Sequence, residues 1–274
     1  MSSAPESSAN YCYRHPDRQS FVLCQRCGRT ICPQCQTQAA VGVHCPECVR
    51  NDRASAPRPR SRVLSALRTS SSQPVVTYSI IGVCILVFIL QNLPGSPVNA
   101  YGVYRPVLTS LMPWTMITAI FLHGSPLHLL FNMYSLFVFG PILEQMLGRG
   151  RYLALYLIAG FGGSVSVLLL SPASGVLGAS GAIFGLMGAF FVIQRRLGGS
   201  NPQILIVIAI NLAAGFFIPG ISWQAHLGGL IAGSLVALIF LRTRQAAQRR
   251  EQVLLVVGLV AALIAVTVAR VLAF

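Results

Sequence analysis

Three short motifs in this chain carry side chains that could perform nucleophilic chemistry. His128 and Asn132 form the first, Ser180 lies in the second, which reads Gly-Ala-Ser-Gly, and His226 lies in the third. A histidine can take the proton of a serine hydroxyl and so activate a weak nucleophile. Asparagine and histidine side chains can donate hydrogen bonds to the oxyanion that the attack creates. Each motif taken alone is explained at least as well by hydrogen bonds or close packing between helices, so the elements that carry them must decide.

The composition indicates that these elements are membrane helices. Of the 274 residues, 54% are hydrophobic and only 9% are charged, whereas about a quarter of a soluble domain is charged. A spanning helix needs about 20 mostly apolar residues. From residue 74 onward the chain contains seven apolar runs, at about 75–92, 126–146, 152–170, 180–195, 203–219, 223–241 and 252–271. Residues 93–125 read as a structured loop with half-buried apolar side chains. We therefore expect an all-α polytopic membrane protein.

The arginines indicate which side of the membrane each loop faces. The 20 basic residues are all arginine, and the net charge is +14. Alternate connections hold most of them, namely the N-terminal region, 149–151, 195–196 and 242–250. Cytoplasmic loops carry the excess of positive charge, so we expect a cytoplasmic N-terminus and a C-terminus outside. High positive charge can also indicate nucleic-acid binding, but charge spread over the loops of one membrane face argues against a nucleic-acid partner.

On this topology the three motifs lie at a similar depth near the outer face. Ser125 and Pro126 form a typical helix start, which places His128 and Asn132 on one helix face within two turns of the outer end. The run that begins at Ser180 is too short to reach both faces of the membrane comfortably. Its first turn should therefore lie below the outer surface, where free backbone N–H groups could bind an oxyanion.

His226 begins the sixth run in the same way, and glycines could bring it to Ser180. The glycines recur at four-residue spacing in the fourth run, at Gly181 and Gly185, and in the sixth, at Gly229 and Gly233. Small residues at this spacing let helix backbones approach closely. Ordinary packing explains them too, and such packing is what would allow a Ser–His pair. Because three helices present polar residues at one depth, a joint catalytic role is favoured over three separate structural ones.

Residues 11–50 are rich in cysteine and could fold around metal ions. Four pairs with two-residue spacers supply eight ligands: Cys12 and His15, Cys24 and Cys27, Cys32 and Cys35, and Cys45 and Cys48. Such spacers let both side chains reach one tetrahedral Zn²⁺, and a segment of about 40 residues needs staples to fold. A disulfide scaffold is the alternative, but the cytoplasm keeps thiols reduced. We expect two structural, fully coordinated zinc ions.

This head resembles B-box-like and other cross-braced zinc fingers. The resemblance implies an interleaved arrangement, in which the first pair shares a zinc ion with the third and the second pair with the fourth. It also implies a cytoplasmic protein partner or a regulatory role for the head. The flexible linker that follows, at 51–73, is basic and rich in serine and proline, and it should lie near the membrane surface.

The membrane part resembles the rhomboid intramembrane proteases, because the three motifs occur in that family's order on alternate helices. The resemblance covers about residues 74–241 and implies a six-helix core, with the run at 252–271 as an added seventh helix. It implies Ser180 as nucleophile and His226 as general base, without an aspartate or a catalytic cofactor. It further implies that Asn132, His128 and the backbone N–H of Ser180 stabilise the oxyanion.

The resemblance also implies a class of substrate and a membrane environment. The chain departs from the family pattern at two positions. The substrates would be single-pass transmembrane proteins in a lipid bilayer. Thr115 follows Trp114 where the family often has arginine, and Phe184 stands where it often has tyrosine, which affects efficiency more than reaction type. Glu144 is expected to be structural and paired with an arginine, and His123 to be structural.

Three rival functions are open at this stage. An inactive relative that binds membrane clients would typically lack Ser180 or His226, and both are present. A transporter would show an internal repeat, and none is visible. A zinc head with a mere membrane anchor would not need seven runs.

The domain organisation we expect is a disordered tail at 1–10, the head at 11–50, the linker at 51–73, the protease core at 74–241, and a cytoplasmic loop with the seventh helix at 242–274. The exclusive use of arginine suggests a bacterial cell membrane.

Overall fold

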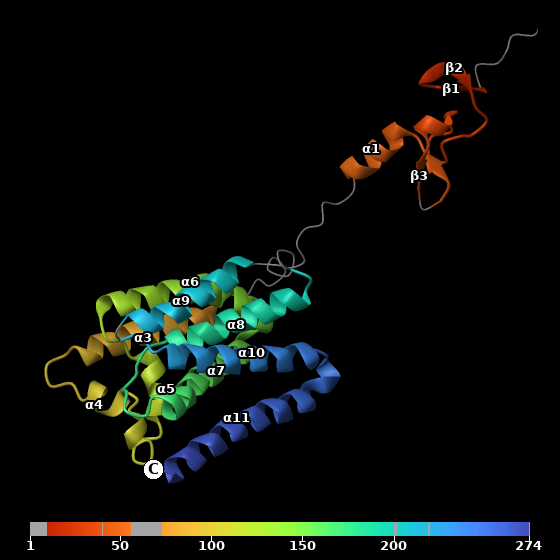
Figure 1. The fold of residues 1–274 in the computed structure, drawn as a ribbon. Coiled ribbons are helices and arrows are strands. Elements are labelled where there is room, and N and C mark those ends of the chain that lie inside the picture. The colour runs from red at the N-terminus through yellow and green to blue at the C-terminus, as the bar shows by residue number, and fades with distance from the viewer. Residues whose placement is uncertain (1–9, 40, 56–72, 200–201, 219, 274) are drawn as a thin grey trace, which may run out of the picture. The chain divides into compact units, whose positions relative to one another are not determined.

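The computed structural model describes residues 10–39, 41–55, 73–199, 202–218 and 220–273. The chain forms two compact units, Met1–Arg60 and Ser61–Phe274 (Figure 1). Most of the tail expected at 1–10 and most of the linker expected at 51–73 lie outside the described residues. Each unit is described here by itself.

The first unit is built from two small hairpins and one helix. β1 (Tyr11–Cys12) pairs antiparallel with β2 (His15–Gln19), and β3 (Thr37–Gln38) pairs antiparallel with β4 (Val43–His44). A 3-10 turn, η2 (Pro33–Cys35), and α1 (Pro46–Ser55) complete it. The helix thus continues past residue 50 into the range expected to be linker. The buried core consists of Ile31 and six cysteines, Cys12, Cys24, Cys32, Cys35, Cys45 and Cys48. So small an apolar core points to metal as the organising element.

The second unit is helical, and each of the seven expected runs forms a helix. The helices are α3 (Val75–Gln91), α6 (Pro126–Leu147), α7 (Arg149–Leu170), α8 (Ser180–Arg196), α9 (Pro202–Phe217), α10 (Trp223–Arg242) and α11 (Arg249–Leu272). Within the described residues, four stretches are long and apolar enough to cross a membrane: α6, α7, α10 and Ala246–Leu272. α3 and α9 are apolar but shorter, and α8 has 17 residues. The expected all-α polytopic membrane architecture is confirmed, while a count of seven spans stays a prediction.

α10 packs between α7 and α8 through backbone contacts at glycines. A Cβ atom added to Gly185 of α8 would lie 2.8 Å from the carbonyl oxygen of Gly229 on α10, and one added to Gly163 of α7 would lie 2.9 Å from that of Ala225. At Gly229 itself an added Cβ would overlap the carbonyl oxygen of Gly181. The close approach of the fourth and sixth runs that glycine spacing predicts is therefore confirmed.

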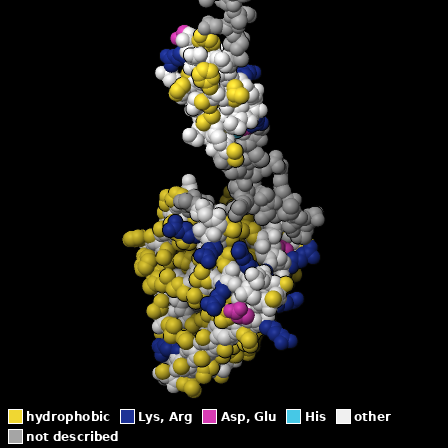
Figure 2. Space-filling view, turned by 90° about the vertical axis from the view of Figure 1, so that its right-hand side faces the viewer, with side chains coloured by type: hydrophobic (Ala, Val, Ile, Leu, Met, Phe, Trp, Pro, Cys, Tyr) yellow, Lys and Arg dark blue, Asp and Glu magenta, His cyan; other side chains and the backbone are white. Residues whose placement is uncertain are grey.

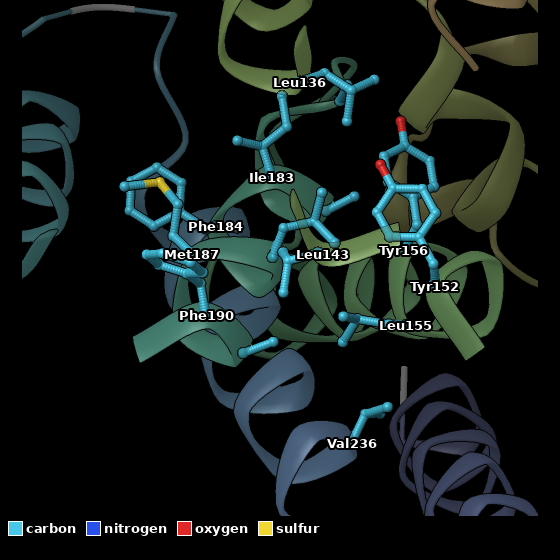
Figure 3. Close-up of a cluster of buried hydrophobic side chains, with 14 of the residues drawn as sticks. Leu136, Leu143, Tyr152, Leu155, Tyr156, Ile183, Phe184, Met187, Phe190 and Val236 are labelled. Atoms are coloured by element: carbon cyan, nitrogen blue, oxygen red, sulfur yellow. The ribbon is translucent and has the colours of Figure 1, made fainter. Parts of the chain in front are cut away.

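Larger side chains fill the space around these glycine contacts. Figure 3 shows the cluster, to which α6 contributes Leu136 and Leu143, α7 contributes Tyr152, Leu155 and Tyr156, α8 contributes Ile183, Phe184, Met187 and Phe190, and α10 contributes Val236. Cys84 of α3 is fully buried in the same cluster, as expected for a small apolar residue. The helices that meet here include α6, α8 and α10, which carry the three motifs.

The loop between α3 and α6 is structured and reaches the segment that precedes Ser180. It contains α4 (Val98–Gly102), η3 (Pro106–Leu108), α5 (Thr115–Thr118) and η4 (Ala119–Phe121). Tyr104 and Val176 form an isolated antiparallel bridge, and the N–H of Gly178 donates to the carbonyl oxygen of Ala119 at 2.9 Å. The Ser164 hydroxyl of α7 donates to the carbonyl oxygen of Met116 at 2.7 Å. The loop therefore holds the approach to α8 in place.

Glu144 is structural, but its expected arginine partner is wrong. Its buried carboxylate accepts hydrogen bonds from the N–H of Val76 at 3.0 Å, the N–H of Thr77 at 2.8 Å and the Thr77 hydroxyl at 2.8 Å. α3 follows Pro74, whose side chain makes no capping hydrogen bond. The first N–H groups of a helix lack intrahelical acceptors and form the positive end of its dipole. Glu144 meets that need from the end of α6.

Candidate active site and metal-binding clusters

Ser180 is the first residue of α8, and the turn before it requires glycine. Gly178 has a φ of +128°, and an added Cβ would lie 2.7 Å from both Cε1 and Nε2 of His128. Only a glycine therefore allows the His128 ring to lie against the chain two residues before Ser180. The N–H groups of the first turn of α8 have no acceptor within the helix, so they can bind a negative charge.

His226 lies in the first turn of α10. Ser222 caps this helix, with its hydroxyl oxygen accepting from the N–H of Ala225 at 3.2 Å. The imidazole is buried and stacks on Phe184 of α8, with ring centroids 4.1 Å apart and an interplanar angle of 9°. Phenylalanine at position 184 thus supports the histidine by stacking.

Ser180 and His226 line the same cavity, which has a volume of about 1040 Å³. A Cβ on Gly181 would lie 3.1 Å from the carbonyl oxygen of Ala225, so the first turns of α8 and α10 touch through their backbones. Among the hydrogen bonds of the described residues, none joins the Ser180 hydroxyl to the His226 ring. Catalytic hydrogen bonds are often long until substrate is bound. The structure brings the two groups to one cavity, and their pairing stays a prediction.

The proposed oxyanion donors lie on α6 and line this cavity too. Ser125 caps α6 by accepting from the N–H of His128 at 3.2 Å, which confirms the expected helix start. The Asn132 side-chain amide donates one hydrogen bond to the carbonyl oxygen of His128 at 2.8 Å. Its second N–H hydrogen is available for an acceptor in the cavity. The structure therefore places Asn132 and His128 in the cavity that holds Ser180.

His123 is a buried structural neighbour of His128. The two rings meet edge to face, with centroids 5.2 Å apart. The backbone of His123 is held by Gln91, which accepts from its N–H at 3.0 Å and donates to its carbonyl oxygen at 3.3 Å. We did not anticipate Gln91 from the sequence. A polar residue at the end of an apolar run was the available signal.

The cavity continues along the gap between α6 and α9. Ser135 and Phe139 of α6 line it, as do Val207 and Asn211 of α9. The side-chain amide of Asn211 donates to the carbonyl oxygen of Val207 in its own helix at 2.8 Å. This bond within the helix fits its position, because Asn211 is exposed along α9 rather than packed against a neighbouring helix.

Three aromatic residues between the end of α9 and the start of α10, and the loop residues Trp114 and Thr115, have clear positions. Phe216 stacks on Trp223, with centroids 4.7 Å apart, and Phe217 is 83% exposed. The Trp114 indole N–H donates to the carbonyl oxygen of Tyr101 at 3.0 Å. The buried Thr115 hydroxyl donates to the carbonyl oxygen of Met112 at 2.6 Å. The loop therefore anchors itself without the arginine that the family often has there.

The cysteines and histidine of the head form two groups that suit zinc. One group is Cys12, His15, Cys32 and Cys35, and the other is Cys24, Cys27, Cys45 and Cys48, with all ligand atoms of a group within 4.8 Å of one another. This grouping is the interleaved one that the B-box resemblance implies. None of the cysteines, all of which lie in the described residues, forms a disulfide.

The distances within the groups fit tetrahedral zinc. Zinc bonds of about 2.3 Å to sulfur and about 2.0 Å to nitrogen place sulfur atoms about 3.8 Å apart, and sulfur about 3.5 Å from nitrogen. The Nδ1 atom of His15 lies 3.7 Å from the Cys12 sulfur and 3.4 Å from those of Cys32 and Cys35. In the other group the sulfurs of Cys27 and Cys45 are 3.7 Å apart. The donor sets and the spacing therefore both fit Zn²⁺, and the ligand assignment stays a prediction.

The electrostatics of the four-cysteine group favour mixed protonation without metal. Burial acts to raise the pKa of the Cys24 thiol, but backbone hydrogen bonds, led by the N–H of Cys45, lower the pKa to about 6. Burial and the neighbouring cysteine side chains raise the pKa of Cys48 to about 12. A cysteine binds zinc as its thiolate, so metal binding would displace the proton from the Cys48 thiol.

Comparison with known proteins shows which proteins this chain resembles. Residues 110–243 match the Rhomboid domain model. The chain is 37% identical over 180 residues to Rhomboid protease GluP of Bacillus subtilis (strain 168), covering 61% of this chain and 35% of that protein. It is 38% identical over 149 residues to RHOMBOID-like protein 6, mitochondrial, of Arabidopsis thaliana, covering 52% and 48%.

A further relative matches over nearly its whole length. Putative rhomboid protease YdcA of Bacillus subtilis (strain 168) is 34% identical over 182 residues, which cover 63% of this chain and 91% of that protein. The chain thus spans about a third to a half of GluP and RHOMBOID-like protein 6, but almost all of YdcA. The matched domain, residues 110–243, contains all three motifs.

Proposed function

Because this chain belongs to the rhomboid family, we propose that it is an intramembrane serine endopeptidase that uses Ser180 as nucleophile and His226 as general base. The observation that carries the proposal is the shared cavity: Ser180, His226, Asn132 and His128 come from three helices and line one space. The names of the relatives GluP and YdcA both contain the words rhomboid protease, which supports the same class of reaction. Ordinary helix packing would not require polar side chains of three helices to converge.

The reaction follows from the roles of these groups. His226 takes the proton of the Ser180 hydroxyl while the oxygen attacks the carbonyl carbon of the scissile peptide bond. The resulting oxyanion accepts hydrogen bonds from the Ser180 N–H, Asn132 and His128. His226 then gives its proton to the leaving amine, which breaks the carbon–nitrogen bond. Water, activated in the same way, releases the acyl group from Ser180.

The substrates we propose are single-pass transmembrane proteins within a lipid bilayer. A peptide bond inside a helix is hidden by its own hydrogen bonds, so the substrate segment must unwind to reach Ser180. The cavity between α6 and α9 offers space next to the nucleophile for such a segment. The arginine distribution supports a cytoplasmic N-terminus and a C-terminus outside. A bacterial cell membrane stays a prediction from arginine usage, because relatives occur in a plant as well as in a bacterium.

We also propose two structural zinc ions in the head and none in catalysis. Cys12, His15, Cys32 and Cys35 would hold one ion, and Cys24, Cys27, Cys45 and Cys48 the other. With four protein ligands each, neither ion has a position for a reactive water. A cytoplasmic protein partner or a regulatory role for the head remains a prediction that deletion of residues 1–60 would test, through the rate of cleavage and the choice of client.

Cleavage of a single-pass reporter by the purified full-length chain in liposomes tests the protease assignment. Wild type should cleave, and Ser180→Ala and His226→Ala should fall to background while remaining monodisperse. Ser234→Ala is a matched control, because Ser234 lies on α10 outside the cavity lining. Cleavage retained in Ser180→Ala would refute the proposal.

One observation favours the alternative of an inactive relative that binds membrane clients, namely that no hydrogen bond joins Ser180 and His226 among those of the described residues. A serine-reactive fluorophosphonate separates the two functions. Labelling of wild type but not of Ser180→Ala or His226→Ala supports an activated nucleophile. Absence of both labelling and cleavage in wild type supports the client-binding alternative.

A further inference from the structure

Three helices of the second unit meet at a corner held by buried hydrogen bonds. Gln252, in the first turn of α11, donates to the carbonyl oxygen of Thr243 at 3.0 Å and to its hydroxyl at 2.8 Å. Its side-chain oxygen accepts from Nε of Arg151, near the start of α7, at 2.8 Å. Thr243 and Gln252 are both buried. The start of α7, the end of α10 and the start of α11 are therefore fixed side by side.

This basic corner carries a strong excess of positive charge. Its arginines are Arg149, Arg151, Arg242, Arg244, Arg249 and Arg250. The one acidic residue on these helix ends, Glu251, pairs with Arg242 at 3.5 Å. Basic side chains gather around an acidic one on the face of the helical unit shown in Figure 2.

Most of these arginines have no carboxylate partner. Within the described residues, no carboxylate lies at ion-pair distance from Arg149, Arg244, Arg249 or Arg250, and all four are exposed. Glu144, which lies close by in sequence to Arg149, is buried and bonded to α3. Like charges on neighbouring helix ends repel one another, so a bound anion would lower the free energy of the folded corner.

Two helix starts add to the positive potential. α7 follows Gly148 and α11 follows Gln248, and neither residue makes a side-chain capping hydrogen bond to its helix. No side-chain acceptor at the N-cap therefore serves the first N–H groups of either helix, and at α11 the N–H of Arg249 donates instead to the carbonyl oxygen of Ala246. Backbone N–H groups at a helix start suit phosphate oxygens, and arginine guanidinium groups bind phosphate with two parallel hydrogen bonds.

The surface next to the arginines is apolar. Along α11, Val253 is 55% exposed, Leu254 71% and Val257 57%. Little of this helix is covered by protein, so acyl chains would cover it in a bilayer. A ligand that suits the whole surface combines a phosphate group with apolar tails. We propose that the basic corner binds the phosphate groups of anionic phospholipids, with their acyl chains along α11.

The distribution of positive charge in membrane proteins alone does not account for this corner. That tendency explains why arginines lie on one membrane face, and Arg195 and Arg196 at the end of α8 are an example of it. At the basic corner, six arginines lie on three chain segments whose ends are joined by one buried polar contact, which Arg151 itself makes with Gln252. A bound phospholipid there would also hold α11 against α7 and α10.

Native mass spectrometry of the full-length chain in detergent tests the proposal. Wild type should retain phosphatidylglycerol in preference to phosphatidylcholine with the same acyl chains. In Arg249→Gln/Arg250→Gln, retention should fall roughly 30-fold, from about fivefold per arginine near an anionic surface. The matched control, Arg195→Gln/Arg196→Gln, removes equal charge from the same expected membrane face and should bind like wild type. Equal loss in both double variants would mean diffuse attraction and would overturn the site.

A second arm distinguishes the phospholipid from free phosphate and guards against misfolding. Phosphatidylglycerol should raise the melting temperature of wild type, and millimolar inorganic phosphate should not. An equal rise with inorganic phosphate would overturn the assignment to a lipid. Arg149→Gln/Arg244→Gln provides an independent variant of the same corner, with the same expected loss of lipid. None of these measurements requires protease activity, so the result is separate from the proposed function.

Discussion

The two units of this chain reach their folds by different physical means. In the head, the buried core is Ile31 and six cysteines, and each of the two groups that could hold a metal ion lies within about 25 residues of the chain. In the helical unit, large side chains of four helices surround backbone contacts between glycines on α7, α8 and α10. Bound metal ions would supply the folding stability that so small a core lacks. The stability of the helical unit depends instead on how closely its helix faces fit one another.

This difference teaches where the information for each unit lies. Ligand spacing is local, so the head can be read directly from the chain. Helix contacts join segments far apart in sequence, such as Gly181 with Gly229, and they need a matching partner surface. We therefore expect metal removal to unfold the head, and a side chain added at a glycine contact to destabilise the helical unit. Four experiments would break or sharpen this contrast, from the largest expected effect to the smallest.

Metal removal should unfold the head and leave the helical unit intact. Structural zinc sites contribute about 10–16 kcal/mol of apparent binding energy, which far exceeds what this small core can replace. A chelator, or Cys24→Ser, should release zinc as measured by elemental analysis and expose amides of residues 11–50 to hydrogen exchange. Reporter cleavage in liposomes should continue. Concerted loss of structure in both units would contradict their independence.

Asn132→Ala should reduce catalysis much more than stability. Removing one oxyanion donor lowers kcat by about 10²–10³, while the lost hydrogen bond runs only to the carbonyl oxygen of its own helix. Asn92→Ala is the matched control, because its side-chain amide donates to the carbonyl oxygen of Phe88 within α3 in the same way and Asn92 does not line the cavity. Reporter cleavage and melting temperature would be measured for both. Equal effects on kcat would remove Asn132 from the catalytic group.

Gly229→Ala should destabilise the core, because its Cβ would overlap the carbonyl oxygen of Gly181. The backbones of α8 and α10 must then separate, at a cost of about 3 kcal/mol, the upper end for overpacking. Gly258→Ala on α11 meets no atom within 4 Å and should stabilise its helix by about 1 kcal/mol. Melting temperatures of the two variants should therefore move in opposite directions. A rise for Gly229→Ala would disprove the tight contact.

Glu144→Gln should weaken the start of α3 by a smaller amount. A neutral amide keeps one acceptor oxygen but loses the charge that strengthens three hydrogen bonds, a loss of about 1.5 kcal/mol. The melting temperature should fall by a few degrees, and hydrogen exchange should increase at Val76 and Thr77. Gln145→Glu, which alters charge at the neighbouring position, serves as a control. Unchanged exchange at α3 would count against the cap.

Sequence alone predicted the helices, which the structure confirms, and it gave the candidate catalytic residues and ligand pairs, which stay predictions. These features depend on local properties: apolar runs of spanning length, Ser125 as a helix cap, two-residue ligand spacers, and polar side chains that are costly in a membrane. The glycine spacing even predicted that α8 and α10 would touch. Each of these patterns has a physical meaning before any partner is known.

The partners themselves were decided by the tertiary structure. Glu144 caps α3 instead of pairing with an arginine, Asn211 bonds within its own helix, and Gln91 and Gln252 join distant segments. A buried polar group takes whichever donor or acceptor the packing places beside it. The sequence reveals that such a group needs a partner, but only the packed helices determine which segment provides it.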